Sequence, residues 1–256
     1  MAFVPDYRTY APGAAADGAA LDAGLRSYML RVYNWMSSGL LLTGIVSYGI
    51  ANTSLIDLFY RQVQTPRGIA TAPTILGYAA IFAPLVFTMV LSFGVNKLSR
   101  PAVQALFWAF AATMGASLAN IFLIYSGASI ARVFFITAGT FGAMSLYGYT
   151  TKSDLSRMGS FLIMGLIGVV IASVVNMFIA SSAIQFAISI VGVLVFVGLT
   201  AYDTQRIKAD YVQYAYAEGT DGAAVRSVFD ALSLYLNFIN LFMLLLQLFG
   251  NRSSNN

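Results

Sequence analysis

The sequence contains no cysteine and no histidine, and it has few charged residues. Without thiols, the sequence excludes disulfides, thiolate nucleophiles and iron–sulfur clusters. Without imidazoles, it lacks the commonest metal ligand and the side chain that normally changes charge near neutral pH. Only 9% of the residues are charged and 59% are hydrophobic, whereas soluble domains carry about 25% charged residues. Lipid must therefore be the solvent for much of this chain.

Long stretches without Asp, Glu, Lys or Arg predict an all-α polytopic membrane protein with seven transmembrane helices. About 20 mostly apolar residues cross a bilayer as one helix. The uncharged stretch from Met158 to Tyr202 is too long for one span, and Ser181 and Ser182 mark the predicted turn within it. The predicted spans are Tyr33–Ala51, Thr74–Val95, Ala102–Tyr125, Val133–Thr150, Met158–Ala180, Ala183–Thr204 and Phe229–Phe249.

The segments outside the spans are short and polar. Residues 1–24 are rich in Ala, Gly, Asp and Pro and lack the apolar core of a signal peptide, so we interpret them as a disordered tail. Residues 25–250 then form the bundle and residues 251–256 a short polar tail. When the seven spans alternate across the bilayer, ten of the 14 basic residues lie on the same side of the membrane as the N-terminus. Basic residues in short loops stay in the cytoplasm, which predicts a cytoplasmic N-terminus. Topology therefore explains the positive net charge without any nucleic-acid partner.

Two aspartates stand at the ends of predicted spans, where ionisable groups are costly and often functional. Asp203 ends the sixth span, where a carboxylate opposes the helix dipole, and Arg206 or Lys208 could pair with it there. Asp230 opens the seventh span, where the helix dipole favours a carboxylate without any further role.

A polar stripe runs along the seventh span. Its members, within an arc of roughly 100° on the helix, are Asp230, Ser233, Asn237, Asn240 and Gln247. Polar groups facing lipid are expensive, so the stripe is expected to face the bundle interior. There it serves either as interhelical hydrogen bonding or as one wall of an ion path. Small residues such as Ala138 with Gly142, and Gly139 with Ala143, similarly predict close helix contacts.

Three segments resemble the Bax inhibitor motif family of membrane proteins, in its bacterial branch. The most specific are Tyr202–Ile207 (YDTQRI) and Ala231–Phe242 (ALSLYLNFINLF), and Leu25–Asn34 (LRSYMLRVYN) adds support. The resemblance covers the chain from about Leu25 to Gly250. It implies six helices around a central seventh, and a calcium-permeable leak whose opening depends on pH.

The resemblance also implies site residues. In that family an aspartate pair joins the sixth and seventh helices, and two close carboxylates cannot both ionise cheaply. The first aspartate falls on Asp203, the expected calcium ligand. The second falls on Asn237, where this chain departs from the pattern and loses the titratable proton. The family arginine that latches the first aspartate corresponds to Asn96, so the latch candidates are Lys97, Arg100 and Arg206.

These features predict an ion leak in a bacterial inner membrane, with calcium as the permeant ion and no cofactor. The alternative is a regulatory membrane protein that modulates a membrane protease or a stress or cell-death response. On that hypothesis a membrane-protein partner contacts residues 1–24 or the loop from Gln205 to Ser227. No nucleophile–base constellation, phosphate loop or metal cluster is visible in the sequence, so we do not expect an enzyme.

Overall fold

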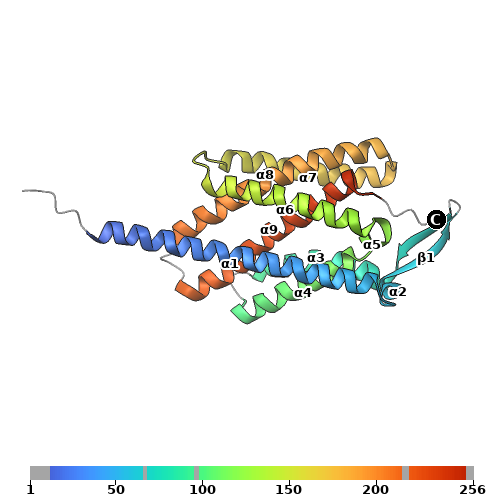
Figure 1. Cartoon of the computed structure of the whole chain (residues 1–256), viewed down its shortest axis with the longest axis horizontal. Helices are drawn as coiled ribbons and strands as arrows, with labels where there is room; N and C mark the ends of the chain where they lie inside the picture. The colour runs from blue at the N-terminus through green and yellow to red at the C-terminus, as the bar shows by residue number, and fades with distance from the viewer. Residues whose placement is uncertain (1–11, 66–67, 95–97, 215–218, 252–256) are drawn as a thin grey trace, which may run out of the picture.

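The computed structural model describes residues 12–65, 68–94, 98–214 and 219–251, and its helices run roughly along one long axis (Figure 1). Lys97 and Asn96 lie outside these residues, as do residues 1–11 of the predicted tail. The elements in chain order are α1 Pro12–Ala51, α2 Ile56–Phe59, β1 Tyr60–Thr65, β2 Gly68–Pro73, α3 Ile75–Gly94, α4 Arg100–Leu118, α5 Ile121–Ile124, α6 Gly127–Thr150, α7 Ser156–Ile179, α8 Ser182–Tyr214 and α9 Gly219–Phe249.

Five helical segments of the described chain are long and apolar enough to cross a membrane. They are Arg100–Ile124, Gly127–Thr150, Ser156–Ile179, Ser182–Gln213 and Gly222–Phe249. A shorter apolar stretch, Ile75–Leu91, lies in α3, and the first predicted span lies within α1. The chain is therefore an integral membrane protein built of helices.

The predicted turn at Ser181 and Ser182 is confirmed. Helix α7 ends at Ile179, Ala180 adopts a left-handed conformation with φ of 55°, and α8 begins at Ser182. The side chain of Asn176 stabilises this reversal, because its Oδ1 accepts a hydrogen bond from the Ser181 backbone N–H at 3.1 Å. A left-handed residue after a helix is a common way to end it.

Several segments differ from the prediction. Helix α8 continues to Tyr214 and α9 begins at Gly219, so the predicted loop from Gln205 to Ser227 is largely helical, and Asp203 and Asp230 lie within helices rather than at their ends. Helix α1 begins at Pro12, inside the predicted disordered tail, because proline suits a first helical turn and the alanines that follow have the highest helix propensity. The loop after the first span folds into an antiparallel hairpin of β1 and β2, with Tyr60 opposite Pro73. The buried Tyr60 hydroxyl donates to the Ser117 carbonyl at 2.8 Å, which anchors this hairpin on α4.

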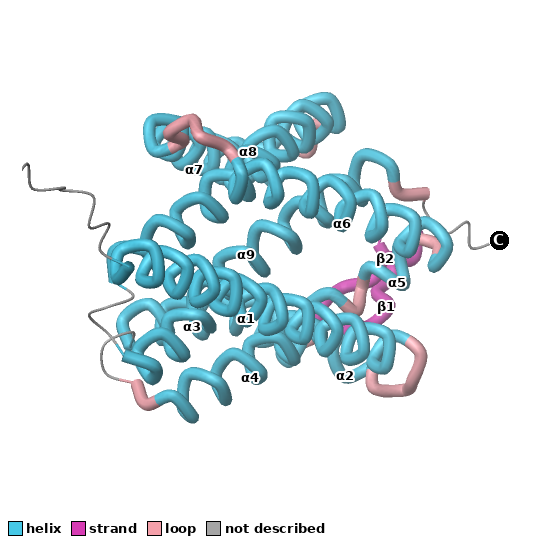
Figure 2. Tube along the Cα trace, turned by 60° about the vertical axis from the view of Figure 1, so that its left-hand side comes forward, coloured by secondary structure: helices cyan, strands magenta, loops and turns pink. Residues whose placement is uncertain are grey.

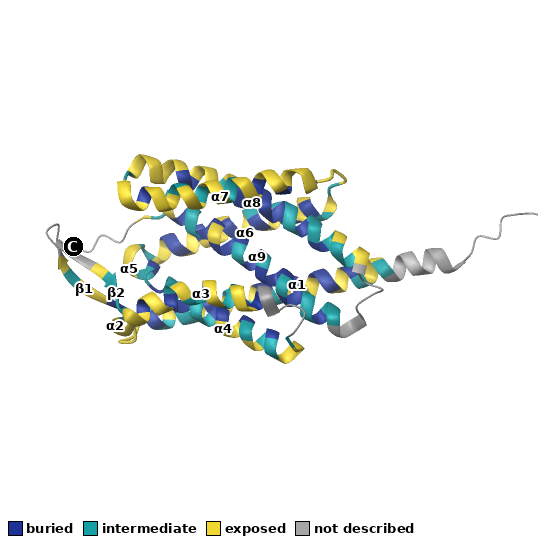
Figure 3. Cartoon of the chain, turned by 180° about the vertical axis from the view of Figure 1, so that it is seen from behind, coloured by how far each residue is buried: buried dark blue, intermediate teal, exposed yellow. Residues whose placement is uncertain are grey.

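Buried residues recur along helix α9 (Figure 3). It contacts α1, α4, α6 and α8, whereas α3 packs mainly on α4 and α7 mainly on α8. In an apolar 18-residue stretch of each helix, 56% of the residues of α9 are buried, compared with 17% of those of α7. The outward side chains of α7 include Phe161, Met164 and Phe178, each at least 70% exposed in the isolated chain. Such an apolar surface is the one that lipid covers.

The predicted close contact of small residues on α6 is wrong for its glycines. Gly139 and Gly142 both face open space, with no atom within 4 Å of where a Cβ would lie. The close approach lies elsewhere on α6, at Gly148, whose added Cβ would stand 2.2 Å from the Ala201 carbonyl oxygen on α8. Small residues are frequent in membrane helices, so their spacing alone does not show which of them face a neighbour.

Candidate functional site

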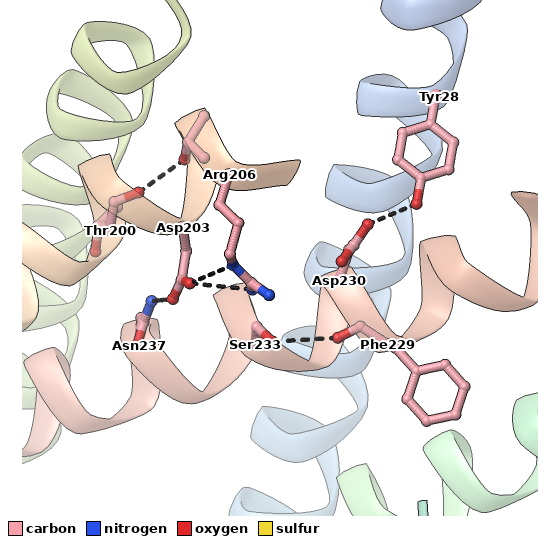
Figure 4. A network of polar contacts seen from close by, with 9 residues as sticks. Tyr28, Thr200, Asp203, Arg206, Phe229, Asp230, Ser233 and Asn237 are labelled. Carbon is pink, nitrogen blue, oxygen red and sulfur yellow. Dashed lines mark hydrogen bonds and ion pairs between the residues drawn. The ribbon is translucent and has the colours of Figure 1, made fainter. Parts of the chain in front are cut away.

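Asp203 of α8 makes a side-chain contact with Asn237 of α9. Its Oδ2 accepts a hydrogen bond from the Asn237 side-chain amide at 2.7 Å. Its Oδ1 lies 3.0 Å from Nη2 and 3.2 Å from Nε of Arg206. Figure 4 shows the three side chains converging between the two helices. The Asp203 side chain is 14% exposed and that of Arg206 is 38% exposed, so the pair sits at the edge of the buried core.

Side chains of the motif Tyr202–Ile207 contact several other segments of the bundle. Gln205 accepts the Leu155 N–H at 2.8 Å and donates to the Ser153 carbonyl at 2.8 Å, which ties α8 to the loop before α7. Ile207 is fully buried. These contacts fix the rotation of α8 about its axis, so that the Asp203 side chain faces α9.

Asp230 forms a separate polar contact. It is 7% exposed, and its Oδ2 accepts a hydrogen bond from the Tyr28 hydroxyl of α1 at 2.5 Å. The Tyr28 ring in turn lies 4.8 Å from that of Tyr211 on α8, centroid to centroid. Asp230 and Asn237 are seven residues apart, about 10 Å along a helix. Asp230 therefore links α9 to α1 rather than replacing the missing partner of Asp203 (Figure 4).

The polar stripe of α9 faces the interior only in part. Asn237 is buried, and Ser233 donates to the Phe229 carbonyl within its own helix at 3.4 Å. Asn240 and Gln247 are exposed in the isolated chain. Gln247 accepts hydrogen bonds from Gln185 at 2.8 Å and from Ser189 at 3.1 Å. The prediction that Asn240 faces the bundle interior is wrong, because its side chain is exposed in the isolated chain while its neighbours Ile239 and Leu241 are buried.

Of the latch candidates, Arg206 contacts Asp203. It comes from the same helix, three residues on, so it neutralises the carboxylate without linking two helices. Arg100 begins α4, and Lys97 lies outside the described residues. The interhelical link at this site is the Asn237 amide instead.

A chain of hydroxyl groups next to the site was not predicted. Tyr33 of α1 is hydrogen-bonded to Ser145 of α6, and Ser145 is hydrogen-bonded to Thr204 of α8 at 2.9 Å. Thr204 follows Asp203 directly. Two of these residues lie in the segments Leu25–Asn34 and Tyr202–Ile207 that carry the family resemblance, but isolated hydroxyls in apolar helices have no spacing that would reveal such a chain.

The site offers few ligands for a cation. Among the described residues no group of three or more His, Cys, Asp or Glu side chains could hold a metal ion. Asp203 and the side-chain carbonyl of Asn237 provide hard oxygen ligands of the kind that calcium prefers.

The loop carboxylate Asp154 is not a neutral-pH sensor. Hydrogen bonds with the Ser156 side chain and backbone hold the pKa of Asp154 below its ordinary value.

Comparison with known proteins places the chain in a family. Residues 25–254 match the family described as inhibitor of apoptosis-promoting Bax1. An inner membrane protein of Escherichia coli, YbhL, is 46% identical over 231 residues, which cover 90% of this chain and 94% of that protein. An uncharacterized protein of Caulobacter vibrioides is 45% identical over 247 residues, covering 95% and 96%. This integral membrane protein therefore belongs to the Bax inhibitor family.

Proposed function

We propose that this protein is a calcium-permeable leak in which cations pass the Asp203 carboxylate between α8 and α9. The observation that carries the proposal is a carboxylate, 14% exposed, held at a helix–helix contact by an amide and a guanidinium. A carboxylate placed inside a membrane bundle is costly and is usually retained for function. The surrounding motif is the most specific part of the resemblance to the family.

The contacts of Asp203 suggest how a closed state is held. Arg206 neutralises the carboxylate and occupies the oxygen that a cation would need. Arg206 is half-exposed and lies on the same helix, so its side chain can swing away without separating α8 from α9. Calcium would then meet the Asp203 carboxylate, the Asn237 carbonyl and water. A site with one carboxylate binds calcium weakly, and weak binding is what conduction requires.

The Asn237 amide predicts a weak pH response. A pair of close carboxylates shares a proton because both cannot ionise cheaply. Here the partner of Asp203 is an amide that donates at 2.7 Å and has no proton to titrate. Asn237→Asp restores a second carboxylate at hydrogen-bond distance and should introduce a pH-dependent leak.

The proposal includes the topology. We place seven spans in the membrane, with α1 and α3 supplying the first two and α9 in the centre. The N-terminus is cytoplasmic according to the distribution of basic residues, and the inner membrane is the expected location because the E. coli relative YbhL is an inner membrane protein.

The test is calcium flux into liposomes that carry the purified protein, from about pH 5 to about pH 8, the range in which paired carboxylates titrate. Asp203→Asn should lower the flux several-fold, because the carboxylate is lost while an amide of the same shape remains. Asp154→Asn is the matched control, since Asp154 is an exposed loop carboxylate, and it should conduct as wild type does. Asn237→Asp should conduct with a clear change across the pH range.

Each variant is first checked for the wild-type elution volume in size-exclusion chromatography, so that a lost flux is not a lost fold. If folded Asp203→Asn conducts like wild type, Asp203 is not on the ion path. If wild type does not exceed empty liposomes at any pH, the leak is refuted for this protein, and recovery of a membrane-protein partner becomes the next experiment.

A further inference from the structure

A lateral groove is lined on one side by residues of α1 and on the other by residues of α6; Figures 1 and 2 show these two helices with α9 behind and between them. A cavity of about 510 Å³ fills one half of it, and its lining on α1 extends from Arg26 to Met36. A second cavity of about 610 Å³ shares Met36 and Phe141 with the first and continues along the same two helices. Asp203 lies between α8 and α9 and does not line the groove, although Ser145 of the lining is hydrogen-bonded to Thr204 beside it.

The part of the groove that begins at Arg26 is apolar along its length. Met29, Leu30 and Leu146 are among its lining residues, and Leu30 and Leu146 are 54% and 63% exposed in the isolated chain. The hydroxyl groups of Tyr33 and Ser145, which also line it, are hydrogen-bonded to each other. An apolar wall with satisfied polar groups favours hydrocarbon over water.

The end of this part is positively charged. Arg26 is exposed, and within the described parts of the chain its guanidinium forms no ion pair or hydrogen bond. The Lys208 ammonium lies 3.0 Å from the carbonyl of Tyr149, another lining residue, and 5.0 Å from the centre of its ring. Two cations therefore flank the mouth of an apolar groove, and a guanidinium pairs well with a phosphate group.

The dimensions match one lipid tail. Arg26 and Met36 are ten residues apart, which is about 15 Å along a helix. This is half of the roughly 30 Å hydrocarbon thickness of a bilayer. We propose that this groove is a binding site for one anionic phospholipid, with its phosphate on Arg26 and an acyl chain between α1 and α6. The site does not depend on the proposed leak, because its geometry involves neither Asp203 nor Asn237.

The experiment is native mass spectrometry of the purified protein incubated with equal amounts of phosphatidylglycerol, which is anionic, and phosphatidylethanolamine, which is zwitterionic. Wild type should retain one phosphatidylglycerol in preference. Arg26→Gln should reduce that preference about fivefold, the effect of one basic side chain at an anionic membrane surface. Arg157→Gln is the control for charge, since Arg157 is also exposed but does not line the groove.

A second pair of variants tests the apolar part. Gly142 lines the groove and has open space at its Cβ position, so Gly142→Leu should fill the groove and abolish retention of either lipid. Gly139→Leu is the matched control, because Gly139 also faces open space on α6 but is not among the lining residues. Equal retention by Gly142→Leu and Gly139→Leu would overturn the site. Equal preference in Arg26→Gln and Arg157→Gln, or no lipid preference in wild type, would overturn its anionic selectivity.

Discussion

Two aspartates of this bundle are held in different ways. Asp203 faces an amide and a guanidinium at the edge of the core, and the guanidinium is free to leave because its side chain is half-exposed. Asp230 is buried and receives a hydrogen bond from a phenol, so its contact can change only if α1 moves relative to α9. If the protein conducts ions as proposed, this difference favours Asp203 as the residue that contacts the ion and Asp230 as a residue that positions α1 against α9.

The Tyr28–Asp230 hydrogen bond gives the first prediction at this scale. Tyr28→Phe removes a donor to a carboxylate that is 7% exposed. We expect the free energy of unfolding in detergent to fall by about 1–3 kcal/mol, the usual cost of leaving a buried polar group without its partner.

A double-mutant cycle with Asp230→Leu, whose side chain cannot accept the hydrogen bond from the Tyr28 hydroxyl, provides the control for that prediction. Residues in direct contact show coupling energies of about 0.5–3 kcal/mol. If the two single changes instead add up in the double variant, the hydrogen bond does not stabilise the fold.

At the scale of the helices, close packing depends on which glycines face a neighbour. Gly148 of α6 meets the backbone of Ala201 on α8, directly beside the segment that carries Asp203. Gly115 of α4 similarly meets the Thr43 carbonyl of α1, with 2.7 Å to the position of an added Cβ. Backbone atoms cannot rotate away as side chains can, so these two contacts set the distances between their helices.

Gly148→Ala should therefore separate α6 from α8. A methyl group 2.2 Å from a carbonyl oxygen forces the backbone to shift, and such overpacking typically costs about 1–3 kcal/mol. Thermal unfolding in detergent measures the loss. Gly139→Ala on the same helix faces open space and should not destabilise the protein, because alanine favours a helix over glycine by up to about 1 kcal/mol. Equal melting temperatures for the two variants would contradict the close contact.

For the whole molecule, the absence of cysteine makes the topology directly measurable. Single cysteines can be introduced at Gln62 in β1 and at Ser153 before α7, which are both exposed. With the N-terminus in the cytoplasm, a membrane-impermeant maleimide applied to spheroplasts should label Gln62→Cys. It should label Ser153→Cys only after permeabilisation, and the reverse pattern would invert the proposed orientation.

The sequence by itself determined the membrane class and most of the spans. Uncharged stretches as long as a bilayer is thick can fold only as membrane helices, because the hydrocarbon offers no partner for a free backbone group. For the same reason the break at Ser181 and Ser182 was predictable. The sequence also singled out Asp203, as an ionisable residue expected at the end of a span. Helix α8 in fact continues to Tyr214, so Asp203 lies within the helix, and its role in ion contact stays a prediction.

The tertiary structure alone decided which partners these residues meet. That Asn237 reaches Asp203 and Asp230 reaches Tyr28 depends on how α1, α8 and α9 cross. The exposure of Asn240, the role of Gly148 rather than Gly139, and the groove between α1 and α6 likewise depend on helix rotation and spacing. Hydrophobicity commits each helix to the membrane, but in an apolar solvent it hardly distinguishes a lipid-facing side from a helix-facing one.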